Sequence, residues 1–249
     1  MKTTKCVVFL ATAVFFGFMP MAGSATLVTY DFPAAAITPT TTAADTLAGN
    51  FTFGTSSPDP DGRVAASGND GGNVFYEPAN GTADSNASSA ITNNFYSAFT
   101  IEPNSGFALN LSTLTFNYGG TSDVTVSFTA NFFVRSSTDG FAADVGTTFS
   151  KSIPANLSIP AYTLASIDLS GAAFQNLSAP VTFRIYAFAD NYSGSFVIAD
   201  RPRIDAINLA GTVGAIPEPS SAALMIVAGG MAGVCLRRRM RSSSASRRL

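Results

Sequence analysis

The clearest candidate for metal chemistry is the tetrapeptide Asp59-Pro60-Asp61-Gly62, in which two carboxylates flank a proline. Alternate carboxylates before a glycine suit a hard cation such as calcium, which takes roughly six to eight oxygen ligands. The EF-hand spacing is absent, because Pro60 directly follows the first aspartate and no glutamate stands at the twelfth position. Proline, aspartate and glycine are also common turn residues, so a plain turn is the favoured interpretation, and calcium at Asp59 and Asp61 is the alternative.

The residue types that most enzymes use are scarce. The chain contains no histidine, and its two cysteines, Cys6 and Cys235, lie near its ends. This removes the commonest general base, the usual zinc ligands and the cysteine nucleophile from the middle of the chain. A glycosidase would have to pair aspartates scattered over turns, since only Glu77 and Glu102 precede Glu218. We therefore predict no catalytic residues, no cofactor and no enzyme activity, with hydrolysis as a disfavoured alternative.

Carbohydrate binding requires aromatic side chains exposed on one face of a domain. The chain has seven tyrosines and no tryptophan. Four of these tyrosines are candidates for such a platform: Tyr76, Tyr96, Tyr118 and Tyr192. Strand tyrosines are more often core or edge residues whose hydroxyl reaches water, so the platform stays the alternative to a packing role.

Two further ligand classes are disfavoured. Ice binding needs a regular array of threonines, whereas Thr113, Thr115, Thr125 and Thr129 occupy ordinary strand positions without a repeat. Nucleic acid is excluded by charge, because residues 31–218 hold all sixteen acidic residues and only six of the fourteen basic ones, a formal charge near −10.

The elements that must position any site are strands. Leu114, Phe116 and Tyr118 alternate with polar residues, which is the period of two expected of half-buried strands. Further strands are predicted at residues 27–32, 47–53, 95–101, 124–134, 149–153, 162–169, 181–185, 196–199 and 204–209. Long loops are expected at 33–44 and 56–89, the second with one short strand near Val74, and no periodicity predicts a helix between 26 and 214. Twenty-one phenylalanines predict an aromatic interior. The fold class is therefore all-β, a single antiparallel β-sandwich of the jelly-roll type.

The N-terminus has the layout of a secretory signal peptide. Lys2 and Lys5 precede an apolar stretch at residues 6–18, and small residues follow up to Ala25. An apolar core of thirteen residues is too short for a membrane span, so we expect a cleaved signal helix at residues 1–25. This implies the Sec translocon and signal peptidase as partners, and a mature domain at residues 26–214.

The C-terminus combines three elements in order. Residues 217–219 read Pro217, Glu218 and Pro219, and an apolar run of fifteen residues follows at 222–236. Fifteen helical residues span about 22 Å, less than the ~30 Å of a bilayer core, so the segment suits transient inner-membrane anchoring. Arginines then keep the end in the cytoplasm by the positive-inside rule, and an ordinary single-pass anchor is the alternative. The arginines of this cytoplasmic stop are Arg237, Arg238, Arg239 and Arg241.

This ending resembles the PEP-CTERM sorting signal of Gram-negative bacteria, on the residues just named. The resemblance covers residues 215–241, about a ninth of the chain, and leaves a basic tail at 242–249 that is expected to be disordered. It implies processing near Pro217–Pro219 by an exosortase, an integral-membrane enzyme, in a bacterium that makes extracellular polysaccharide.

Three hypotheses for the mature domain follow. The first is an exported protein of the cell surface or extracellular matrix with a structural or adhesive role. The second is a carbohydrate-binding module that acts on extracellular polysaccharide, and the third is an enzyme that uses aspartate pairs. The lack of histidine and cysteine in the mature domain favours the first two.

Overall fold

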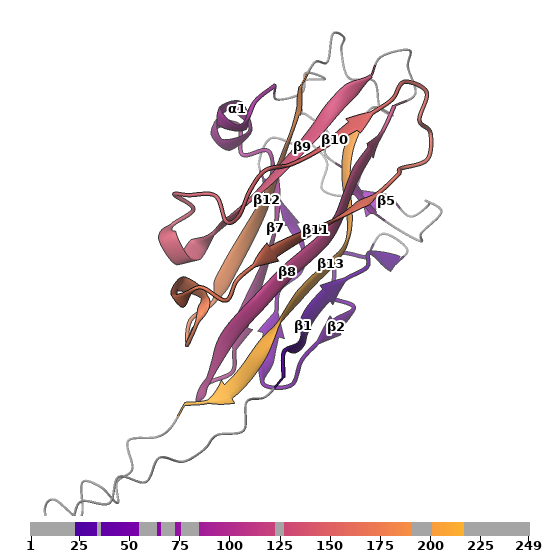
Figure 1. The fold of residues 1–249 in the computed structure, drawn as a ribbon. Coiled ribbons are helices and arrows are strands. Elements are labelled where there is room, and N and C mark those ends of the chain that lie inside the picture. The colour runs from indigo at the N-terminus through magenta and orange to yellow at the C-terminus, as the bar shows by residue number, and fades with distance from the viewer. Residues whose placement is uncertain are drawn as a thin grey trace, which may run out of the picture.

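Alternating apolar residues make the long strands amphipathic, and the computed structural model buries them between two sheets (Figure 1). The structure describes residues 23–33, 36–54, 64–65, 73–75, 85–122, 127–190 and 201–216. Every strand pairing among these residues is antiparallel. The predicted antiparallel β-sandwich is therefore confirmed.

Sheet A has seven strands, in the order β11-β8-β13-β1-β2, with β6 paired to β13 and β5 to β6. Strands β8 and β13 pair along almost their whole length, from Arg201 opposite Thr121 to Ala215 opposite Phe107. The strands of sheet A are β1 (Ala25–Tyr30), β2 (Thr41–Thr42), β5 (Val64–Ala65), β6 (Asn73–Phe75), β8 (Phe107–Thr121), β11 (Thr163–Asp168) and β13 (Arg201–Ala215).

Sheet B has six strands, in the order β10-β9-β12-β7-β3, with β4 also paired to β7. Its strands are β3 (Thr46–Ala48), β4 (Thr52–Phe53), β7 (Tyr96–Pro103), β9 (Phe128–Ser136), β10 (Phe149–Ile153) and β12 (Val181–Asp190). From β11 onward each strand lies in the opposite sheet from the one before it, a crossing pattern that fits the jelly-roll expectation.

Short helices occur where the sequence predicted none. They are α1 (Ala87–Thr92) and the 3-10 turns η2 (Ser137–Asp139) and η3 (Ala172–Phe174). Helix α1 begins with a capping box: the Asn86 side chain accepts a hydrogen bond from the Ser89 amide at 2.9 Å, and the Ser89 hydroxyl accepts one from the Asn86 amide at 3.4 Å. Six residues are too few to show a helical period, so the cap was the usable sequence signal.

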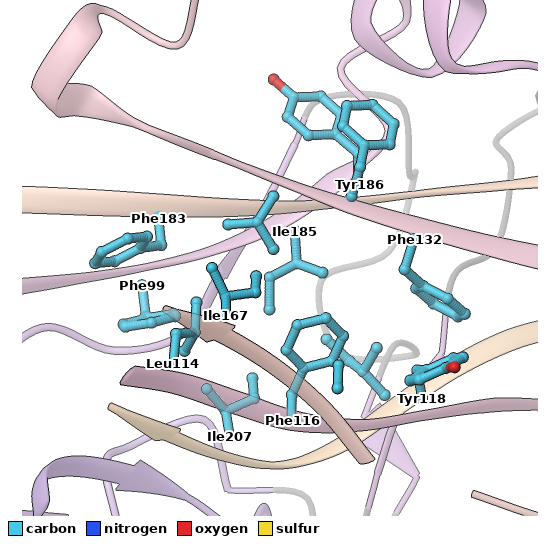
Figure 2. Close-up of a cluster of buried hydrophobic side chains, with 14 of the residues drawn as sticks. Phe99, Leu114, Phe116, Tyr118, Phe132, Ile167, Phe183, Ile185, Tyr186 and Ile207 are labelled. Carbon is cyan, nitrogen blue, oxygen red and sulfur yellow. The ribbon is translucent and has the colours of Figure 1, made fainter. Parts of the chain in front are cut away.

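Aromatic rings fill the space between the two sheets, as the phenylalanine content predicted. In sheet B, the Phe99 and Phe183 rings stack with centroids 5.5 Å apart. Across the sheets, Tyr118 of β8 meets Phe132 of β9 at 5.7 Å. Figure 2 shows these side chains with Phe116, and all of them are buried. The gain from such contacts is area burial plus about 0.5–1.5 kcal/mol per aromatic pair.

Strand β13 is interrupted by two shifts of register, of which the second lies between Ala210 and Gly211. A Cβ atom at Gly211 would collide with the backbone carbonyl oxygen of Asn110 and would lie 2.9 Å from Leu27 Cδ1. The close approach of two backbones at this bulge therefore requires glycine.

Several predicted boundaries need correction. The predicted strand at 47–53 is split into β3 and β4, the loop at 33–44 contains β2, and the loop at 56–89 contains β5 as well as β6 and the start of α1. The strand segments expected at 124–126 and 196–199 lie outside the described residues.

Within the described residues, no helix has both the length and the apolar character needed to cross a bilayer. The predicted membrane segment at 222–236 and most of the predicted signal peptide, residues 1–22, lie outside that part of the chain.

Candidate functional site

The sorting segment begins where sheet A ends. Strand β13 runs to Ala215, and the Ile216 amide still donates a hydrogen bond to the Gly106 carbonyl at 2.8 Å. Pro217 is the next residue, so a single residue separates the last strand from the Pro-Glu-Pro motif. The residues of the motif and of the cytoplasmic stop lie outside the described part of the chain: Pro217, Glu218, Pro219, Arg237, Arg238, Arg239 and Arg241.

Both ends of the described domain lie at the same end of the sandwich. Ala25, the first residue of β1, pairs with Gly211 near the end of β13, and the two strands are antiparallel. Figure 1 shows the start of β1 and the arrowhead of β13 close together at the lower end of the sheets. The predicted signal-peptide cleavage site after Ala25 therefore lies beside the C-terminal part of β13.

A second feature is an aromatic layer on the outer face of sheet B. Phe183 and Ile185 of β12 face the core. Because side chains alternate along a strand, Tyr186, which follows Ile185, points to the outer face. Figure 2 shows Tyr186 on the opposite side of the strands from Phe99 and Phe116. Tyr186 stacks on Phe133 of β9, with ring centroids 4.8 Å apart and an interplanar angle of 6°.

This outer layer is nevertheless buried. Phe133 is 0% exposed and Tyr186 is 2% exposed. Helix α1 packs against β12 and buries Ala90, while the segment after β9 folds back so that the Val145 amide reaches the Val134 carbonyl at 2.7 Å. Covered by these two elements, the outer layer acts as a second, smaller core.

Arg184 lies at the margin of the aromatic layer. Its guanidinium carbon is 3.7 Å from the centroid of the Phe141 ring and 4.5 Å from that of Tyr96. Phe141 has a positive φ of 64° and follows Gly140, also at positive φ. The left-handed conformation is strained for a bulky residue, and here it places the Phe141 ring over the Arg184 guanidinium.

A second arginine stands directly opposite the first. Arg135 of β9 is the cross-strand partner of Arg184. The Arg135 Nε atom donates to Asp144 Oδ1 at 2.8 Å, and its Nη1 atom donates to the Phe141 carbonyl at 3.1 Å. The ion pair neutralises Arg135, so the local group retains one net positive charge on a domain that is otherwise acidic.

The sequence-predicted site residues are dispersed or unplaced. Asp59, Asp61, Tyr76 and Tyr192 lie outside the described residues. Tyr118 is 8% exposed and packs in the core, so it is wrong as a member of an exposed platform.

Of the four tyrosines, Tyr96 alone is both placed and partly exposed, beside Arg184. In the part of the chain that the structure describes, no three acidic or other metal-ligating side chains come together.

The threonines weighed for ice binding do not share a face. Thr113 and Thr115 point outward from β8 in sheet A, whereas Thr129 lies on β9 in sheet B, and Thr125 is outside the described residues. No array of the four can therefore form on one surface.

Solved structures resemble the chain in general shape. The cleaved adhesin domain of Lys-gingipain from Porphyromonas gingivalis is 15% identical, with 76% of this chain and 100% of that chain covered and a TM-score of 0.38. A carbohydrate-binding module specific for non-crystalline cellulose is 10% identical, with coverage of 65% and 88% and a TM-score of 0.36. A family 11 carbohydrate-binding module from Clostridium thermocellum is 10% identical, with coverage of 74% and 96% and a TM-score of 0.31. No conclusion about function or ligands follows from scores this low.

Sequence comparison points to the C-terminal segment. No curated protein matches the chain. A family model does match residues 215–239, and it describes the PEP-CTERM protein-sorting motif. The match contains the Pro-Glu-Pro tripeptide, the apolar run and the first three arginines of the stop. It supports export toward the cell surface and exosortase-dependent processing, and the chain therefore carries a PEP-CTERM protein-sorting motif at residues 215–239.

Proposed function

We propose that the chain is an exported protein that loses both ends and then serves a structural or adhesive role at the cell surface or in the extracellular matrix. It enters through Sec, loses its signal peptide after Ala25, rests on the inner membrane through residues 222–236, and is cut by exosortase near Pro217–Pro219. The observation that carries this proposal is the position of the motif one residue after β13.

The position of the motif bears on what processing leaves behind. A cut at or after Pro217 keeps all of β13, which lies between β8 and β1 in sheet A. A cut several residues earlier would shorten that strand and expose its partners. The arrangement thus allows the anchor to be removed while the sandwich stays intact.

A carbohydrate-binding role is the second candidate. It is favoured by the partly exposed aromatic rings of Tyr96 and Phe141 beside Arg184. An enzymatic role has no comparable support among the described residues, which bring no group of metal-ligating side chains together.

Intact mass of the protein from its native bacterium tests the proposal. We expect a mature form that begins at Thr26 and ends near Pro217–Pro219. Glu218→Ala should retain the C-terminal tail, whereas Glu102→Ala, an exposed glutamate on β7, should be processed normally. Recovery of wild-type protein from the cytosol with both ends still attached would contradict the proposal.

A further inference from the structure

Arg184 carries hydrogen-bond donors that the domain does not use. Its two contacts, with Phe141 and Tyr96, involve ring faces and the guanidinium charge. Neither contact uses any of the five guanidinium N–H donors, and none of the described residues accepts a hydrogen bond from them. On the neighbouring strand, Arg135 donates hydrogen bonds to Asp144 and to the Phe141 carbonyl. A partly exposed guanidinium held in place by rings therefore has its donors available to a ligand.

The pairing of two arginines is unfavourable for the domain alone. Like charges directly opposite each other on adjacent strands destabilise a sheet. Arg184 and Arg135 occupy such a pair, although residues 31–218 contain only six basic residues against sixteen acidic ones. Asp144 offsets Arg135, and no described carboxylate is bonded to Arg184.

A small side chain and two hydroxyl groups lie next to Arg184 on the outer face of sheet B. The cross-strand partner of Arg184 on β7 is Ala98, whose side chain ends at Cβ. One position further along the same face, Thr100 and Thr182 are paired, and their hydroxyl oxygens are 2.8 Å apart. The outer face of sheet B thus presents a fixed guanidinium, two partly exposed aromatic rings and a hydroxyl pair in one patch.

We propose that this patch, centred on Arg184, binds the carboxylate of an acidic sugar in a polysaccharide. A planar guanidinium matches a carboxylate with two parallel hydrogen bonds, and side chains already fixed by stacking lose little entropy on binding. The sugar ring lies against Phe141 and Tyr96. Because the rest of the domain is acidic, the ligand carries its carboxylates sparsely among neutral sugars. The proposal rests on the surface location given under the proposed function.

The test uses the full chain in a mild nonionic detergent. The probe is glucuronoxylan, whose neutral xylan backbone carries sparse glucuronic acid groups. The matched probe is the same polymer with its carboxyl groups chemically reduced. We expect at least tenfold tighter binding to the acidic polymer, and competition by free glucuronate that equal concentrations of inorganic phosphate do not produce. Equal binding of both polymers, no binding, or equal competition by phosphate overturns the assignment.

Variants locate the site. Arg184→Met should lower the affinity at least tenfold, and Arg184→Lys should recover only part of it, because an ammonium lacks the planar fork. Asp144→Asn frees Arg135 and should tighten binding, which keeps the test valid if Arg184→Met folds poorly. The control is Lys151→Met, which removes a positive charge from the edge strand β10, where Lys151 Nζ bonds Thr163. An equal loss in Lys151→Met would indicate nonspecific charge attraction and refute the site.

Export is scored separately by intact mass. Arg184→Met should be exported and trimmed like the wild type, since the sorting segment is unchanged. Normal trimming without polymer binding would refute the carbohydrate site and leave the proposed function standing. Failure of trimming in the wild type would refute the proposed function itself.

Discussion

Replacing Phe133 with alanine tests whether the outer aromatic layer of sheet B is a second core. The side chain points away from the space between the sheets but is 0% exposed and stacks on Tyr186. Truncating a buried phenylalanine to alanine lowers the free energy of unfolding by about 3–5 kcal/mol. For a domain of this size that corresponds to a melting temperature lower by roughly 6–20 °C.

Thermal and urea unfolding provide the assay, followed by tyrosine fluorescence because the chain has no tryptophan. The control is Leu164→Ala on the outer face of sheet A, where the side chain is 64% exposed, and it should change stability by less than about 0.5 kcal/mol. A double-mutant cycle with Tyr186→Ala should give a coupling of about 0.5–1.5 kcal/mol. If Phe133→Ala behaves like the control, the outer layer is solvent-exposed and the account of its cover by α1 and residues 137–148 is wrong.

Three further predictions concern single contacts. Burial raises the pKa of the Tyr30 hydroxyl, so the stability that the neutral hydroxyl contributes is complete below about pH 10, where unfolded tyrosine ionises, and declines above that pH. Tyr30→Phe should therefore flatten the alkaline limb of a stability–pH curve, and an unchanged limb would refute the role of Tyr30. Gly211→Ala should destabilise by about 1–3 kcal/mol in urea unfolding because of the backbone collision, whereas Gly214→Ala, with nothing within 4 Å of the added Cβ, should be near neutral; equal effects would contradict the packing argument. Asp144→Asn should cost less than about 1 kcal/mol and lose that effect in 1 M salt, because its ion pair with Arg135 is at the surface; a larger, salt-independent cost would show the pair to be structural.

Period-two alternation predicted most of the sandwich because the sheet cores depend on it directly. Val181, Phe183 and Ile185 were expected on one face of a strand, and all three are buried on the inner face of β12. The same alternation puts Tyr118 on the same face as Leu114, four residues earlier, and both side chains are buried. Tyr118 therefore does not belong to a surface platform.

Alternation says nothing about what covers the far side of a sheet. Phe133 and Tyr186 occupy outward positions, and their burial depends on a six-residue helix and on a loop that returns across the strands. Such cover arises from tertiary contacts that no local pattern encodes. The Arg184 patch was missed for the same reason, since its two rings come from β7 and from the segment after η2.

The pairing of β1 with β13 has a consequence for secretion. The first strand of the domain hydrogen-bonds to the last, from Ala25 opposite Gly211 to Tyr30 opposite Ile207. Contacts of such long sequence separation form slowly. The pairing of β1 with β13 cannot form until almost the entire domain has been synthesised. If the chain takes the proposed export route, it can therefore remain unfolded while its leading part enters the translocation pore, and sheet A would close only after the last strand has passed through.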